Sequence, residues 1–150
     1  MYTYFYMIKG LLGSEGFEVQ ARLEGDALKG RVGGALMARE INLLLNDKGV
    51  RGAIGAVKLN LELQSGELTG QIGADAVSLR GVDQISCSIG AGIAALALRA
   101  VQREDTLEGR IGGPNGKSFT VALDGAPGWI GALLMLSAYC ALERAQGVSK

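Results

Sequence analysis

The sequence predicts a mainly β protein in which about twelve antiparallel strands pack on one buried, hydrophobic C-terminal helix. Three observations lead to this fold class. A seven-residue phrase recurs along the chain, the segments between its copies alternate apolar and polar residues, and the stretch 126–142 contains no charged residue. Alternation with period two is typical of half-buried strands, whereas a long uncharged run ahead of a polar end is typical of a buried helix.

The repeated phrase reads apolar-x-Gly-x-(Val/Ile)-Gly-(Gly/Ala). Clean copies lie at 28–34, 50–56, 68–74 and 107–113, and the stretch 85–91 carries Cys87 where the other copies have their first glycine. From one such position to the next, the steps are 22, 18, 17 and 22 residues. A unit of about 20 residues is therefore reused with loops of variable length.

The strands can be followed in order along the chain. The first is expected near residues 2–9, and alternating segments follow at 17–23 and 41–45. Residues 57–63 alternate strictly, with apolar residues on one face and Lys58, Asn60 and Glu62 on the other. Turn residues at 64–66 then lead into 67–72, which predicts a hairpin, and a last strand is expected at 118–123.

The first glycine of each phrase calls for a physical reason, because glycine inside a strand costs roughly 0.5–1 kcal/mol relative to alanine. Gly30, Gly52, Gly70 and Gly109 fall on the apolar face. We expect a bulky element, the C-terminal helix, to approach the sheet there, or the strand to bend at a barrel corner. Cys87 is interpreted as a small apolar filler at the same position.

The C-terminal segment predicts a helix over about 127–146. Pro127 suits a first turn, the body is rich in Ala, Leu and Met, and Gly147 follows a polar last turn. The apolar residues surround the helix, so it is either buried on all sides or inserted in a bilayer, and the dry faces of the strands favour burial. We expect Trp129 to plug the mouth of the barrel.

A long antiparallel meander closes into a barrel or folds into a sandwich, because an open sheet of that width would leave a long edge. A parallel β-solenoid is a further alternative for a period near 20 residues. The uneven period and the hairpin-type breaks at 46–49, 64–66 and 115–116 favour the barrel. The whole chain, 1–150, is expected to form a single domain.

This order of elements resembles the tubby-like superfamily, which includes tubby proteins, phospholipid scramblases and LURP-one-related proteins. The resemblance rests on about a dozen antiparallel strands followed by the apolar helix at 126–142. It implies a closed β-barrel wrapped around that helix. The glycine-rich repeat also resembles those of uncharacterised bacterial β-repeat proteins, which implies no function.

Composition excludes several classes of function. The formal net charge is zero, with 15 basic and 15 acidic residues, so no basic stripe is evident that would recruit nucleic acid, and none is expected as a partner. The chain has no histidine and only two cysteines, without CxxC spacing. We therefore expect no metal, no cofactor and no disulfide scaffold, and a reducing cytoplasm as the location.

Candidate catalytic residues are scarce. Without histidine the usual general base and nucleophile pairs are missing, and most carboxylates fall at turns or on the polar face of a strand. Arg39 and Glu40 interrupt an apolar stretch, and Arg80 and Asp83 flank Gly81; each set is expected to lie at the surface. No catalytic residue is assigned.

The candidate binding surface is a stripe of Tyr2, Tyr4 and Tyr6, which share one face of the first strand. Three functions stay open. The first is a non-enzymatic binding or scaffold module acting through its surface on a protein, on a lipid or on its own copies. The second is a carrier of a small hydrophobic or lipid ligand between sheet and helix. The third is an enzyme that uses carboxylates alone.

Overall fold

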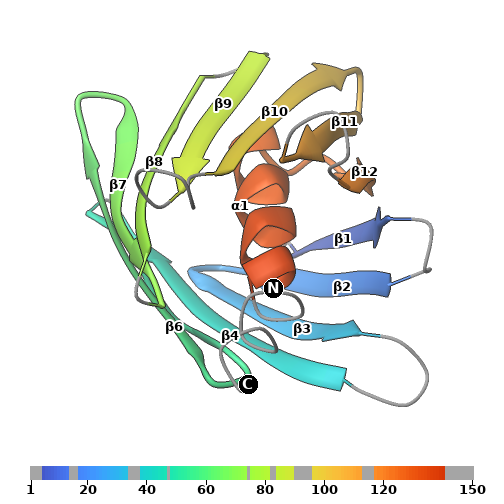
Figure 1. Ribbon diagram of the computed structural model, residues 1–150. Helices are drawn as coiled ribbons and strands as arrows, with labels where there is room; N and C mark the ends of the chain where they lie inside the picture. The colour runs from blue at the N-terminus through green and yellow to red at the C-terminus, as the bar shows by residue number, and fades with distance from the viewer. Residues whose placement is uncertain are drawn as a thin grey trace, which may run out of the picture.

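The chain folds as an antiparallel meander that closes on itself (Figure 1). The structure, a computed structural model, describes residues 5–13, 17–33, 38–46, 48–73, 75–81, 84–89, 96–112 and 117–140. Within these ranges each strand pairs antiparallel with its sequence neighbours, and the last strand pairs with the first. The predicted barrel is confirmed, and its antiparallel closure rules out the solenoid and the sandwich.

The described part of the chain contains twelve strands and one helix. The strands are β1 (Phe5–Leu12), β2 (Phe17–Glu24), β3 (Ala27–Gly33), β4 (Ala38–Asn46), β5 (Gly49–Ile54), β6 (Val57–Gln64), β7 (Glu67–Ile72), β8 (Asp75–Arg80), β9 (Gln84–Ile89), β10 (Leu96–Arg103), β11 (Thr106–Ile111) and β12 (Lys117–Ala122). The helix α1 (Gly128–Tyr139) follows them.

The predicted alternation sets the inside and the outside of the barrel. In β6, Leu59 and Leu61 are buried, whereas Lys58, Asn60 and Glu62 are exposed. Because successive side chains of a strand point to opposite faces, the same rule gives the strands an apolar lumen side and a mainly polar outer side, on which Leu11, Leu44 and Val101 are exposed exceptions. The outer wall is therefore the surface that the barrel offers to solvent.

Short turns join the hairpins. Between β6 and β7, Ser65 has φ 53° and Gly66 has φ 78°. Positive φ at both central residues is the geometry of a two-residue type I′ turn, whose twist matches that of the flanking strands. The expected hairpin at 57–72 is confirmed, with Leu63 opposite Leu68 in register.

Each copy of the repeated phrase forms the second strand of a hairpin, in β3, β5, β7, β9 and β11. An imperfect sixth copy, not recognised from the sequence, lies at residues 8–14, and its first five residues belong to β1. Ile8, Gly10, Leu12 and Gly13 occupy the phrase positions there. Leu12 in place of Val or Ile and Ser14 in place of Gly or Ala concealed it. All odd-numbered strands thus derive from one pattern.

Close approach between neighbouring strands explains the repeated glycines. A Cβ atom on Gly30 would lie 2.7 Å from the Cα of Ala21, and on Gly70 it would lie 2.8 Å from the Cα of Leu61. Each of these atoms belongs to the preceding strand and is the register partner of that glycine. Gly52 and Gly109 show the same crowding, by Leu43 and Ala100. The expected approach of the helix to these four glycines is therefore not the cause, because strand backbone occupies the space.

The helix does approach one glycine of the sixth copy. A Cβ atom on Gly10 would lie 2.7 Å from Sδ of Met135. The missing side chain in β1 makes room for a methionine of α1, a flexible side chain that fills irregular gaps. The helix that was expected to approach the phrase glycines therefore does so at Gly10.

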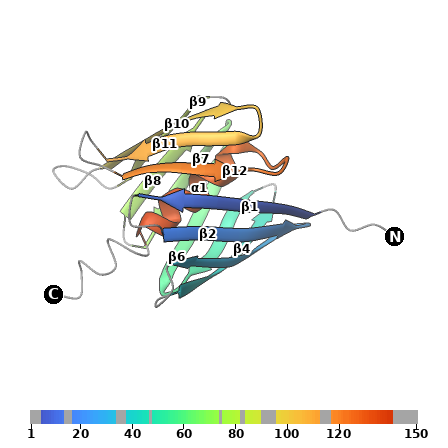
Figure 2. The same cartoon turned by 90° about the vertical axis from the view of Figure 1, so that its right-hand side faces the viewer.

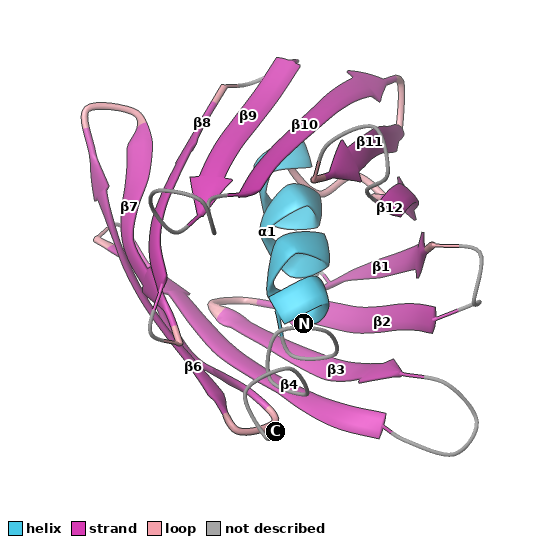
Figure 3. Ribbon diagram, in the orientation of Figure 1, coloured by secondary structure: helices cyan, strands magenta, loops and turns pink. Residues whose placement is uncertain are grey.

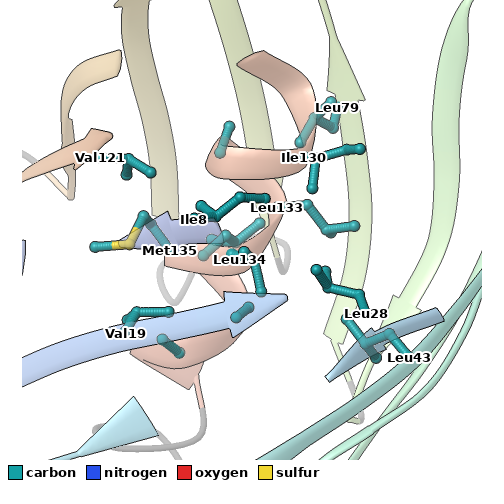
Figure 4. Packing of buried hydrophobic residues seen from close by; sticks show 14 of the residues in the cluster. Ile8, Val19, Leu28, Leu43, Leu79, Val121, Ile130, Leu133, Leu134 and Met135 are labelled. Atoms are coloured by element: carbon teal, nitrogen blue, oxygen red, sulfur yellow. The ribbon is translucent and has the colours of Figure 1, made fainter. Parts of the chain in front are cut away.

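Helix α1 lies inside the barrel, enclosed by strands (Figures 2 and 3). It packs mainly against β1, β2 and β8–β11. Leu133, Leu134 and Met135 are fully buried, and Figure 4 shows them surrounded by side chains of the wall. Pro127 immediately precedes the helix, with extended backbone. The expected end near residue 146 lies outside the described residues, and Cys140 still has helical dihedral angles.

Two aspartates fix the corner where the chain turns from β12 into the lumen. The Met7 amide donates to Oδ2 of Asp124 at 3.0 Å, and the Gly125 amide donates to Oδ1 of Asp105 at 2.8 Å. These bonds tie the start of β1 and the β10–β11 turn to the segment that leads into α1. They satisfy amides that the sheet leaves unpaired.

The crowding at the repeated glycines gives a first prediction. Replacing Gly70 by Val should lower the free energy of unfolding by about 2 kcal/mol or more, because the side chain meets the backbone of β6 and the native φ of 156° disfavours it. Gly66→Asn in the adjacent turn is the control, since asparagine accepts positive φ and nothing lies within 4 Å. Chemical denaturation measures both. Equal effects of the two substitutions would contradict the packing explanation.

The packing of α1 gives a second prediction. Leu134→Ala should cost about 2–5 kcal/mol, because it leaves a cavity in a closed interior. Leu11→Ala is the matched control, since Leu11 is 52% exposed on the outer wall, and its cost should stay within about 0.5 kcal/mol. Thermal or urea unfolding distinguishes them. A small loss for Leu134→Ala would mean that the helix is loosely held.

Candidate functional site

The lumen of the barrel is an apolar core filled by the protein itself. Inward-facing residues of the strands and nearly the whole of α1 are buried. Ser137 is the buried polar residue of the described chain, and its Oγ has no hydrogen-bond partner there. An isolated hydroxyl among leucines offers no set of convergent polar groups of the kind that positions a ligand.

The described carboxylates do not converge. No group of three or more Asp, Glu or Cys residues that could hold a metal ion occurs within the described ranges. Asp105 and Asp124 are engaged with backbone amides. Glu40 is exposed on β4, opposite Arg31, whereas Arg39 is half-buried and lies against Gly55.

Both cysteines are buried, and neither forms a disulfide. Cys87 lies in β9 between Leu79 and Leu98, which agrees with a small apolar filler at its phrase position. Burial raises the pKa of the Cys87 thiol from 9.0 to about 12, with a further contribution from Cys140 and a smaller opposing one from the Ser78 backbone. A protonated thiol is a poor nucleophile, so we expect Cys87 to have low nucleophilic reactivity at neutral pH.

The aromatic residues singled out in the sequence lie in different settings. Tyr2 and Tyr4 fall outside the described residues. Tyr6 is half-buried and packs against the core, next to Gly125. Trp129, the second residue of α1, is also half-buried against the core. The tyrosine stripe stays a prediction.

The outer wall carries two groups of basic residues. One lies on β2 and β3, where Arg22 is opposite Lys29. Acidic residues accompany this group: Arg22 lies 3.9 Å from Glu24, and Arg31 is opposite Glu40.

The second group runs across β8–β11. The register places Arg80 opposite Ser86, Ser86 opposite Arg99, and Arg99 opposite Arg110. We call Arg80, Arg99 and Arg110 the arginine row; all three are exposed. A hollow of about 420 Å³ adjoins it, lined in part by Ser86, Arg99 and Val101.

In the sequence, Arg80 stood out only for its nearness to Asp83, which lies outside the described residues, and neither Arg99 nor Arg110 stood out at all. These residues come from separate strands, so no local motif marks them. The pairing of Arg99 with Arg110 could have been predicted from a two-residue turn at Glu104 and Asp105, because a hairpin centred there places these two arginines opposite each other.

The raised pKa of Cys87 gives a third prediction. The unfolded thiol loses its proton above about pH 9, whereas the folded thiol keeps it up to about pH 12. The folded state then binds more protons, so stability should fall between these values by up to about 1.4 kcal/mol per pH unit. Denaturation at several pH values should show a shallower slope for Cys87→Ala. Identical slopes would show that the Cys87 thiol does not couple to folding.

No helix among the described residues combines the length and the apolar character needed to cross a membrane. No protein-family model, curated protein or solved structure matches the sequence.

Proposed function

We propose that this protein is a non-enzymatic binding or scaffold module that acts through the outer wall of its barrel. The observation that carries the proposal is the filling of the lumen by α1, whose residues from Ala132 to Leu136 are fully buried. A barrel that serves as a carrier keeps a cavity for its ligand, and this core consists of packed side chains. The outer wall is then the surface left for recognition.

The alternatives have less support. A carrier would need space between sheet and helix, where the described side chains already pack against each other (Figure 4). An enzyme based on carboxylates would need two of them in one cleft. Asp105 and Asp124 instead accept hydrogen bonds from backbone amides. Kinship with the tubby-like superfamily, a cytoplasmic location and a protein partner or self-association belong to the same proposal.

Ligand uptake tests this function. The purified protein should carry no stoichiometric apolar molecule in native mass spectrometry, and it should not enhance the fluorescence of a fatty-acid probe. A protein with an established fatty-acid cavity is the positive control for the probe. Stoichiometric uptake by the wild-type protein, abolished by Ala132→Phe in a chain that still folds, would establish the carrier function and overturn the proposal.

A further inference from the structure

The arginine row is a line of positive charge that the fold assembles from three strands. Arg80 lies on β8, Arg99 on β10 and Arg110 on β11, with Ser86 of β9 between the first two. Ser118 of β12 continues the line beyond Arg110. Since neighbouring strands are about 4.8 Å apart, the row spans roughly 14 Å across the strands.

Two of the three arginines of the row have side chains without a partner, whereas Arg110 takes part in a further interaction. The side chains of Arg80 and Arg99 make no hydrogen bond or ion pair within the part of the chain that the structure describes. Glu67 lies opposite Arg80 and accepts a hydrogen bond from the Ser78 hydroxyl. Arg99 faces Arg110 directly, and like charges opposite each other destabilise a sheet. In the basic group on β2 and β3, by contrast, the Arg22 side chain forms an ion pair with Glu24 at 3.9 Å.

The surroundings of the row favour an extended ligand. The adjoining hollow is lined by Ser86, Arg99 and Glu108, and by Val101, which is 42% exposed. An extended peptide places its same-side residues about 6.8 Å apart, so three alternate acidic side chains span roughly 14 Å. This length matches the row, and an apolar side chain of the same peptide could enter the hollow beside Val101.

We propose that the arginine row binds an extended acidic segment of a protein partner through arginine–carboxylate pairs. The planar guanidinium fork accepts a carboxylate in two parallel hydrogen bonds, which makes arginine suited to this chemistry. Ser86 and Ser118 supply further donors along the line. The inference rests on the proposed surface function and names its partner by chemical class.

Other polyanions fit the row less well. Single-stranded nucleic acid is bound by basic grooves together with aromatic side chains for base stacking, and every aromatic side chain that the structure describes is buried or half-buried. The row is also one residue wide and bordered by Glu67 and Glu108, unlike a broad basic patch.

The experiment measures binding of a short fluorescent peptide with glutamate at alternate positions, by fluorescence anisotropy at low salt. The double variant Arg99→Gln, Arg110→Gln should weaken binding about tenfold or more. The matched control is Arg22→Gln, Lys29→Gln, which removes the same charge from a facing pair on β2 and β3 and should change affinity less than about twofold. Thermal unfolding confirms that both variants fold.

The remaining arms decide between kinds of partner. The same peptide with glutamine in place of glutamate should not bind, and rising salt should weaken binding of the acidic one. Equal losses in the two double variants would overturn the inference, because net charge alone would then explain binding. Stronger row-dependent binding of oligothymidine, or of phosphatidylserine vesicles, would overturn the acidic peptide as partner while leaving the surface function intact. Failure of all three probes would overturn the row as a site, and the ligand-uptake experiment would still judge the surface function separately.

Discussion

A closed barrel of twelve strands has to be filled, and the rest of this structure depends on that requirement. Eight strands leave an interior that side chains alone can occupy, and the diameter grows with strand number. The wall of this barrel therefore needs a separate element in its lumen, and α1 supplies it. Because strands surround the helix, its apolar residues cannot be confined to one stripe, which explains an uncharged segment from 126 to 142 in a polar-surfaced protein.

The wall of the barrel repeats a small residue at the third position of the phrase in its odd-numbered strands. Each odd-numbered strand brings its third phrase position close to a neighbour, and glycine at most of these positions lets the backbones approach. Cys87 shows that the position accepts a small side chain where the pairing partners are Leu79 and Leu98. In β1 the space left by the missing side chain of Gly10 is filled by Met135 of the helix. A small residue at the same phrase position thus allows neighbouring strands to approach closely and, in β1, allows α1 to pack against the wall.

Much of the fold could be predicted from the sequence, because period-two alternation and turn chemistry are local signals. They gave the number of strands, their antiparallel order and the buried helix. The cause of the glycines could not be predicted, since the atoms that crowd Gly70 belong to another strand and only the register reveals them. The candidate surface was harder still. The arginine row has no counterpart in the linear sequence, because Arg80 and Arg99 become neighbours through Ser86 only when three strands align.

The position of α1 after all twelve strands has a consequence for synthesis on the ribosome. Hairpins such as β6–β7 involve neighbours in sequence and can pair as they emerge, but β1 has no partner on its second edge until β12 is made. The element that fills the lumen is made later still. Until then the growing chain is an open sheet with an unpaired edge and an uncovered apolar face, the features that promote aggregation. Pairing of β12 with β1 and insertion of α1 therefore convert an aggregation-prone open sheet into a closed barrel.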